Sequence, residues 1–466
     1  MQEFVFQIDP HSKLPLYRQL YQYLIEEIKG GNLRPGEKLP GKKSLAAHLG
    51  LSQSTVETAY GMLAAEGYVE TRPRSGCYVQ TLEKPPLTAF RPFPPPSKKT
   101  APPSYRFSLL SGNIDTMVFP FSTWAKITRE ALYDDQELLR YGHSQGEYSL
   151  RTDLSKYLHE FRGVNCRPDQ VIIGAGLEYL VPLVCCLLGG ETKFALEDPS
   201  YPKTVSILRN AGAPLCFLPV DGEGLSLSAL EQSGASAVYI TPSHQFPLGV
   251  VMPVGRRLGM LRWAAQSPDR YIIEDDYDSE FRYNGAPIPA LQGLDENGKV
   301  IYVGTFSRSI APAFRLAYMV LPEQLLCRYE RLFSAYSSTV SRLDQKILER
   351  FLGEGFFRRH LNRMRNVYRQ RRDALVQAFT ASPLAPYLTV LGENAGLHFL
   401  LRVDLGRSSE ELVAAAARAG VQLLPLSAFY SCQRPPKGVV VVGFAGLLPE
   451  DAPAVVDLLA KAWLPA

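Results

Sequence analysis

A proline-rich stretch near the amino terminus divides the chain into two parts. Residues 81–103, TLEKPPLTAFRPFPPPSKKTAPP, cannot form a helix or a central strand, because proline fixes φ and lacks an amide donor. This composition is typical of a semi-rigid spacer. At 466 residues the chain is also too long for one hydrophobic core. We therefore expect a small domain over residues 1–80, a linker over 81–103, and a large domain over 104–466.

The first eighty residues have the pattern of a helical domain followed by a β-hairpin. Apolar residues recur at every fourth position at Leu16, Leu20, Leu24 and Ile28. This spacing predicts one buried face of a helix that ends at Gly30 and Gly31. A second helix is predicted to end at Gly50, and a third to begin at Ser52 as its N-cap. The third helix is predicted to turn Val56, Tyr60 and Leu63 inward.

The segment YVETRPRSGCYV then predicts a hairpin whose turn contains Pro73, Ser75 and Gly76. Two helices joined by a tight turn and followed by a hairpin form a winged helix-turn-helix, a fold that binds double-stranded DNA. Residues 1–80 carry a net charge of only +1, so the argument rests on where the basic side chains lie. The candidate DNA-binding residues are Lys42, Lys43, Ser52, Gln53, Ser54, Thr55, Arg72 and Arg74. The alternative is that the lysine pair is a solvated helix start and that the Ser and Thr residues only cap the helix.

From residue 104 onward, short apolar runs alternate with helical patterns. Runs such as QVIIG, KFALED, SAVYIT, RYIIEDD and KVIYVGT are each followed by a loop rich in Gly, Pro, Ser or Asp. This alternation predicts an α/β domain with a mostly parallel, doubly wound sheet whose ligands bind at the carboxyl ends of the strands. The last hundred residues have the pattern of a smaller α+β lobe.

The loops after these strands carry groups suited to an anionic, aromatic ligand. Gly174 to Gly176 precede an apolar helix whose first amides can hold a phosphate. Tyr201 offers an aromatic face, and Asp275, with Tyr277 beside it, can face a protonated ring nitrogen. Arg315 offers a bidentate clamp for phosphate. Each also has a plainer interpretation: an ordinary turn, a solvated strand end, or a structural ion pair for Arg315.

Two sets of motifs, in this order, resemble one family. The series GAGLEYL, EDPSYP, TPSHQFPLG, EDDYDSEF, GTFSRS and RLAY is similar to the fold-type-I aminotransferase domain of the MocR/GabR transcriptional regulators. The segment LPGKKSLAAHLGLSQSTVETAYGMLAAEGYVETRPRSGCYV is similar to their GntR-like DNA-binding domain. The resemblance covers nearly the whole chain outside the linker. It implies a DNA-binding regulator that forms a homodimer, often head-to-tail.

The resemblance also implies a pyridoxal phosphate site, with one decisive departure. In the family a lysine of the GTFSK motif holds the cofactor as a Schiff base, and Arg308 stands at that position here. A guanidinium stays protonated and is not a nucleophile, so it cannot form that bond or move a substrate proton. Lys299 lies before the strand, on its wrong side, so no other lysine is expected to replace it. The cofactor-binding residues that the resemblance indicates are Ala175, Gly176, Tyr201, Asp275, Tyr277, Ser307, Arg308 and Arg315.

Two further departures argue against transamination. The family often has an arginine after the tyrosine of the EDPxY loop, where this chain has Lys203, and the KGVVVVGF segment lacks the arginine that grips a substrate carboxylate. The pocket is then expected to bind pyridoxal phosphate non-covalently or to bind another anionic effector instead.

The function expected from the sequence is a DNA-binding regulator that senses a small molecule through a degenerate aminotransferase domain. The alternatives are an active pyridoxal-phosphate enzyme fused to a DNA-binding module, and a large domain that is only a scaffold. The seven cysteines form no CxxC or metal-ligand spacing, which favours buried thiols, a cytoplasmic protein and no metal site. We see no secretory signal at the amino terminus.

Overall fold

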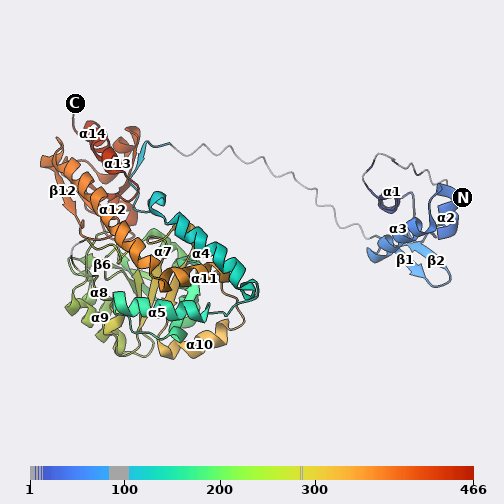
Figure 1. Ribbon diagram of the computed structural model, residues 1–466, viewed down its shortest axis with the longest axis horizontal. Helices are drawn as coiled ribbons and strands as arrows, with labels where there is room; N and C mark the ends of the chain where they lie inside the picture. Colours follow the sequence, from blue (N-terminus) through green and yellow to red (C-terminus); the bar gives the residue numbers. More distant parts are fainter. Residues whose placement is uncertain are drawn as a thin grey trace. The chain divides into compact units, whose positions relative to one another are not determined.

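The computed structural model describes residues 14–82, 104–283, 285 and 287–465, together with residues 6, 9 and 12 (Figure 1). The chain divides into two compact units, Met1–Ala101 and Pro102–Ala466. Most of the expected linker, residues 83–103, lies outside the described residues.

The amino-terminal unit is a winged helix-turn-helix. Its elements are α1 (Leu16–Gly30), α2 (Lys42–Leu49), α3 (Gln53–Ala65), β1 (Val69–Arg72) and β2 (Gly76–Val79). The two strands pair antiparallel, with Arg72 opposite Gly76. Leu20, Leu24 and Ile28 are buried against α3, as the fourfold spacing predicts. Leu16 was expected to be buried too, but it is 42% exposed. It is the first residue of α1, and the buried residues of the helix begin one turn later, at Leu20.

The ends of these helices follow from local chemistry. Gly31 and Gly50 adopt the left-handed conformation just after α1 and α2, which suits glycine because it lacks a Cβ. The Ser52 hydroxyl accepts a hydrogen bond from the Thr55 amide at 3.1 Å, so the predicted N-cap of α3 is confirmed. Val56, Tyr60 and Leu63 of α3 are buried, also as predicted.

The second unit contains a large lobe built on an eight-stranded sheet in the order β4-β11-β10-β9-β8-β5-β6-β7. Its strands are β4 (Val171–Gly174), β5 (Phe194–Asp198), β6 (Leu215–Asp221), β7 (Gly224–Leu225), β8 (Ala237–Ile240), β9 (Tyr271–Asp276), β10 (Val300–Thr305) and β11 (Ala317–Val320). The five strands from β10 to β6 run parallel, whereas β11 is antiparallel to both of its neighbours and β7 is antiparallel to β6. The predicted mostly parallel sheet is confirmed.

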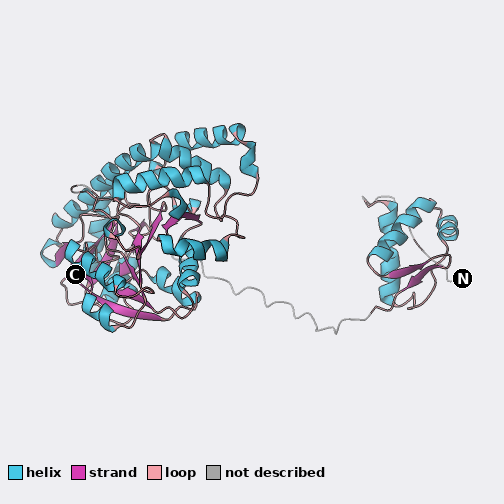
Figure 2. Cartoon of the chain, turned by 90° about the horizontal axis from the view of Figure 1, so that it is seen from below, coloured by secondary structure: helices cyan, strands magenta, loops and turns pink. Residues whose placement is uncertain are grey.

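Helices cover both faces of this sheet, as Figure 2 shows. Ile172 and Met319 pack with α6, α7 and α10, whereas Val171 and Val320, their neighbours in sequence, pack with α4, α5 and α11. Side chains alternate along a strand, so both sets are apolar because both faces are buried. The helices of this lobe are α4 (Phe121–Asp134), α5 (Tyr148–Arg162), α6 (Leu177–Leu188), α7 (Pro202–Asn210), α8 (Leu227–Gln232), α9 (Val254–Ala265), α10 (Glu323–Phe333) and α11 (Arg342–Gly353).

A smaller α+β lobe completes the second unit, as predicted. Its four-stranded sheet has the order β12-β13-β16-β15, from β12 (Leu388–Leu391), β13 (His398–Val403), β15 (Leu424–Pro425) and β16 (Val439–Gly443). Its helices are α13 (Ser409–Arg418) and α14 (Ala452–Trp463). The long helix α12 (Phe356–Thr380) joins the lobes, with Phe357 in the core of the large lobe and Phe379 in that of the small one (Figure 1).

The segment just after the linker belongs to the small lobe, which the sequence did not indicate. β3 (Phe107–Ser108) pairs in parallel with β14 (Val421–Gln422), and the Gly443 amide donates to the Leu109 carbonyl at 2.8 Å. The remaining short elements are the 3₁₀ helices η1 (Thr116–Val118), η2 (Gln136–Leu139), η3 (Pro168–Gln170), η4 (Gln292–Leu294), η5 (Pro312–Phe314), η6 (Ala385–Tyr387), η7 (Leu426–Phe429) and η8 (Pro449–Asp451).

Two further findings bear on the sequence analysis. None of the helices within the described residues is long and apolar enough to cross a membrane.

The expectation of buried thiols is only partly right. Cys77 and Cys185 are buried, but Cys186, Cys327 and Cys432 are exposed because they lie on outward faces or in loops.

Candidate functional site

A pocket of about 170 Å³ lies where the strands of the large lobe end. It is formed by the loops and helix starts that follow β4, β5, β8, β9 and β10, which is where a doubly wound sheet binds its ligands. Seven of the eight predicted cofactor-binding residues line it: Gly176, Tyr201, Asp275, Tyr277, Ser307, Arg308 and Arg315. Ala175 does not line it, because its amide donates instead to Thr339 Oγ1 at 2.9 Å.

Asp275 forms the deep end of the pocket. It is 5% exposed, and one carboxylate oxygen accepts a hydrogen bond from the Tyr239 hydroxyl at 2.6 Å. The other oxygen, Oδ1, is buried without a hydrogen-bond partner among the described residues. Burial raises the pKa of Asp275 to about 7, although the Tyr239 hydroxyl acts in the opposite direction. A buried carboxylate with one unsatisfied oxygen calls for a donor from a bound group.

Aromatic side chains form the middle of the pocket. Tyr201 is 42% exposed, and its ring packs edge-on against Phe246 with centroids 5.4 Å apart. Tyr277 is the neighbour of Asp275 on the chain, and its hydroxyl lies 3.0 Å from His244 Nδ1. That nitrogen also lies 3.0 Å from Asp278, whereas Nε2 of His244 is buried without a partner among the described residues.

Arg308 reaches across the pocket to the small lobe. Its Nη1 donates to the backbone carbonyl of Ser111 at 2.5 Å. Ser111 follows the segment that pairs with the small lobe, so this bond joins the two lobes over the pocket. Within the described residues, Arg308 has no carboxylate partner. The residue at the lysine position therefore ties the lobes together and leaves a positive charge beside Tyr277.

The end of the pocket beside the start of α6, where we predict that a phosphate lies, contains three charged side chains. Arg315 Nη2 pairs with Glu178 Oε2, and Lys203 Nζ pairs with Glu178 Oε1. Gly176 precedes α6, and a Cβ at this position would meet the guanidinium of Arg315. Arg315 thus lines the pocket, and its guanidinium is paired with Glu178, as the plainer interpretation of Arg315 expected; its role as a phosphate clamp stays a prediction.

The sequence predicts that no other lysine replaces the missing one, and the positions of two lysines bear on this prediction. Lys299 lies away from the pocket, donating to the carbonyls of Ser267 and Pro268 at 2.9 Å each. Lys203, however, lines the pocket from the first turn of α7. Its ammonium is paired with Glu178 Oε1, a carboxylate that also lines the pocket.

Sequence reasoning missed several lining residues. Glu178, Thr241, Thr305 and Gly112 also line the pocket. Glu178 could have been found, because it lies two residues after Gly176 in the first helical turn. Gly112 could not, because the loop that brings it there depends on the pairing of β3 with a strand over 300 residues later.

These residues fit a pyridoxal-phosphate ring that is bound without a covalent bond. The unpartnered oxygen of Asp275 matches a protonated ring nitrogen, and Tyr201 provides an aromatic wall. Arg308 lines the pocket at the position that holds a lysine in the family, and a guanidinium is not a nucleophile.

The amino-terminal unit places its basic side chains at two positions. Lys42 and Lys43 begin α2, and Lys42 pairs with Glu57 of α3 at 2.5 Å. Arg72 and Arg74 lie in the hairpin, where Arg72 pairs with Glu70 at 2.9 Å and Arg74 has a φ of 59° in the turn. The predicted residues at the start of α3 are Ser52, Gln53, Ser54 and Thr55; Thr55 is half-buried and the other three are exposed.

Comparison with known proteins agrees with both units. Residues 107–457 match the family described as aminotransferase class I and II, and residues 16–79 match bacterial regulatory proteins of the gntR family. The chain is similar to kynurenine aminotransferase from Pyrococcus horikoshii, with a TM-score of 0.69 and 25% identity over 77% of this chain and 92% of that one.

Full-length relatives share the same arrangement. The chain is 41% identical to the uncharacterized HTH-type transcriptional regulator YdeL of Bacillus subtilis, over 97% of each chain. It is 36% identical to the probable rhizopine catabolism regulatory protein MocR of Rhizobium meliloti, over 98% of this chain and 95% of that one. It is 31% identical to the pyridoxine biosynthesis regulator PdxR of Corynebacterium glutamicum, over 93% of each. The chain therefore belongs to the MocR-type HTH transcriptional regulators, which join a GntR-family DNA-binding domain to an aminotransferase class I and II domain.

Proposed function

We propose that this protein is a transcriptional regulator whose winged helix binds operator DNA and whose aminotransferase-like unit binds a pyridoxal-phosphate-class ligand without covalent attachment. One observation carries the second part: a formed pocket keeps a buried carboxylate oxygen without a partner, while Arg308 stands where a lysine would attach the ligand. Regulators of bacterial transcription act in the cytoplasm, which is where we place it.

Each residue of the pocket has a role toward such a ligand. Asp275 would accept a hydrogen bond from the ring nitrogen, and Tyr201 would cover the ring. Arg308, Ser307 and Arg315 would donate to the aldehyde and phosphate oxygens. When bound, the ligand would supply an electron-withdrawing ring, but no side chain is placed to attack it. Because Arg308 also holds Ser111, a ligand that engages Arg308 changes a bond between the lobes, which is a means of signalling binding.

The DNA-binding role is supported by the charge pattern of the first unit. The sequence order is that of a winged helix, with two lysines before α3 and two arginines after it. The lysines are Lys42 and Lys43 at the start of α2, and the arginines are Arg72 and Arg74 in the hairpin. We propose that these four side chains contact phosphates and that Ser52, Gln53, Ser54 and Thr55 face the groove.

We also propose a homodimer, through a surface formed by the segment from η1 to the start of α5. Large apolar side chains are exposed along this segment at Met117, Phe121, Leu132, Tyr133, Leu139, Tyr141 and Tyr148. An apolar patch of this kind marks an interaction site, and a second copy is the partner that regulators binding two half-sites require. Sedimentation of Leu139→Ser with Tyr141→Ser should show a weakened dimer; an unchanged association constant would contradict this surface.

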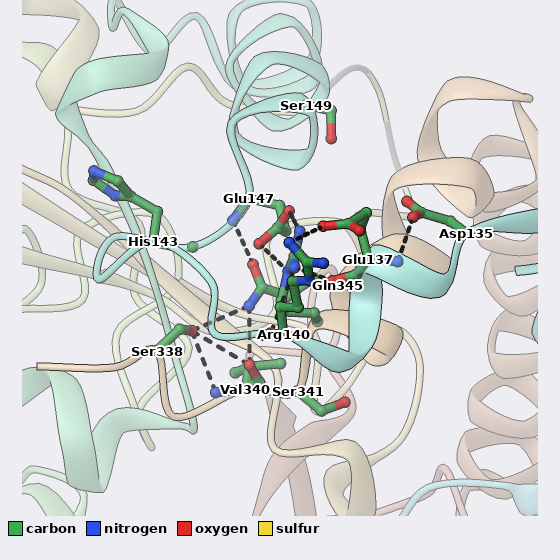
Figure 3. Close-up of polar contacts among 12 residues, drawn as sticks. Asp135, Glu137, Arg140, His143, Glu147, Ser149, Ser338, Val340, Ser341 and Gln345 are labelled. Atoms are coloured by element: carbon green, nitrogen blue, oxygen red, sulfur yellow. Dashed lines mark hydrogen bonds and ion pairs between the residues drawn. The ribbon is translucent and has the colours of Figure 1, made fainter. Parts of the chain in front are cut away.

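The loop that carries Leu139 and Tyr141 is firmly held, which supports this surface. Figure 3 shows Gln345 between Glu147 and Ser338, and its side chain accepts from the Glu147 amide at 2.7 Å and donates to Ser338 Oγ at 3.1 Å. Arg342 pairs with Glu147 at 2.8 Å. A loop ordered beforehand loses little conformational entropy when a partner covers it.

A second function, catalysis with pyridoxal phosphate, is favoured by one observation, the lysine Lys203 in the pocket wall. Incubation of the full chain with pyridoxal phosphate, followed by dialysis with and without borohydride, separates the two functions. The regulator should release its chromophore on dialysis even after borohydride treatment. A trapped adduct at Lys203 would support catalysis, and absence of binding would contradict the ligand proposed here.

A further inference from the structure

The phosphate end of the pocket has three kinds of donor for an anion. They are the first amides of α6, the guanidinium of Arg315 and the ammonium of Lys203. The start of a helix together with two cations is a strong combination for a phosphate group. A phosphorylated ligand would need all of them.

Both cations already converge on one carboxylate of the chain, which lies in the first turn of α6. Glu178 Oε2 pairs with Arg315 and Glu178 Oε1 with Lys203, so each oxygen has its own cation. Burial alone would raise the pKa of Glu178, but Lys203, the residue's own backbone amide and the charge of Arg315 together lower it. Glu178 is therefore ionised at neutral pH and carries the charge that a phosphate would bring.

The pairing of Arg315 with Glu178 requires a glycine at position 176. This residue has a φ of +85°, and a Cβ there would meet both the guanidinium of Arg315 and the carboxylate of Glu178. The glycine at position 176 therefore permits Arg315 to lie against the start of α6, and Glu178 lies in the first turn of this helix. The pairing is part of how the loop is built.

We propose that Glu178 is an internal competitor for the phosphate group of the ligand, so that binding requires this carboxylate to give up Arg315 and Lys203. The inference rests on the proposed function, since it concerns the same pocket. It assigns to Glu178 the control of affinity for phosphate monoesters, and it predicts that ligands without a phosphate do not compete with it. Displacing Glu178 also frees the first turn of α6 to respond to the ligand.

The test measures the affinity of the full chain for pyridoxal phosphate and for pyridoxal, which lacks the phosphate, by absorption titration at neutral pH. Glu178→Gln keeps the shape of the side chain and removes its charge, so it should bind pyridoxal phosphate about tenfold more tightly. Its affinity for pyridoxal should change less than about twofold. Glu178→Ala serves as a second variant if the amide perturbs folding, which the midpoint of thermal unfolding reveals.

Two controls isolate the effect. Glu231→Gln removes one negative charge from the exposed surface of α8, outside the pocket, and should leave both affinities unchanged. Adding Arg315→Met to Glu178→Gln should abolish the gain, because the freed donor is then missing.

The outcomes separate this inference from the proposed function. If the parent chain binds pyridoxal phosphate and Glu178→Gln binds it no more tightly, Glu178 is not a competitor, and the proposed ligand is retained. If only Glu178→Gln binds it, Glu178 is a competitor, but pyridoxal phosphate is not the natural ligand. If neither protein binds it, both the competition by Glu178 and the proposed ligand are contradicted.

Discussion

The winged helix and the pocket both contain basic side chains that the chain pairs with its own carboxylates, and we propose that both bind anions. In the winged helix two cations have a carboxylate each: Lys42 pairs with Glu57 and Arg72 with Glu70. In the pocket two cations share Glu178. The carboxylates also differ in exposure, 58% for the side chain of Glu57 and 38% for that of Glu178.

This difference indicates how each region responds to its ligand. Pairs between exposed side chains contribute little and are screened by salt, so DNA phosphates can replace them at small cost. A carboxylate that holds two cations at a helix start inside a pocket is harder to displace. We therefore expect DNA binding by the winged helix to depend mainly on the number of its cations, and phosphate binding in the pocket to depend mainly on Glu178.

The largest effect should come from removing the cations of the winged helix together. Substitution of Lys42, Lys43, Arg72 and Arg74 by alanine should weaken binding to the chain's own promoter region by at least about a hundredfold at low salt. The dependence of affinity on salt should flatten as well, because fewer counterions are released. Fluorescence anisotropy over a series of salt concentrations measures both. Unchanged affinity would contradict the DNA contacts proposed here.

A smaller effect is expected from the other end of the pocket, where Asp275 has an unpartnered oxygen. Its pKa is raised to about 7 in the folded chain, so the folded state holds a proton that the unfolded state has lost above pH 4. Stability from this group is therefore present at low pH and is lost as the pH rises through 7. From pH 6 to 8 the parent chain should lose about 1 kcal/mol relative to Asp275→Asn.

The measurement for Asp275 is the midpoint of thermal unfolding of both proteins, free of ligand, across this pH range. The two midpoints should converge or cross as the pH rises. Parallel curves would show that Asp275 does not titrate between pH 6 and 8, which would contradict its raised pKa.

The smallest effect should come from the exposed carboxylates of the winged helix. Glu57→Gln and Glu70→Gln each release a cation, but salt screens these pairs. Each should strengthen DNA binding by less than about threefold, well below the gain expected for Glu178→Gln in the pocket. A gain at Glu57 as large as that at Glu178 would break the contrast between the two regions.

The strand-end loops of the large lobe were predictable from the sequence, because parallel strands end at one edge of a sheet. That rule predicts from the sequence that Tyr201, Asp275 and Arg308 lie close together, and all three line one pocket. The helix-turn-helix was predictable for a similar reason, since its spacing, caps and turn are all local, and only Leu16 was misplaced.

Contacts between distant parts of the chain were not predictable. Glu178 and Arg315 are 137 residues apart, and Arg308 and Ser111 are 197 apart. Neither pairing has a local signal, because both depend on how two loops or lobes meet after folding. The role of Lys203 was missed for this reason: its motif indicated a departure from the family, but not that its ammonium lines the same wall as Glu178.

The central claim is that Arg308 makes the pocket a receptor, and mass spectrometry of borohydride-treated protein tests it most directly. After incubation with pyridoxal phosphate, the parent chain should keep its unmodified mass, whereas Arg308→Lys should gain one phosphopyridoxyl group at position 308. A phosphopyridoxyl group on the parent chain, together with exchange of amino groups between an amino acid and a keto acid, would contradict the account.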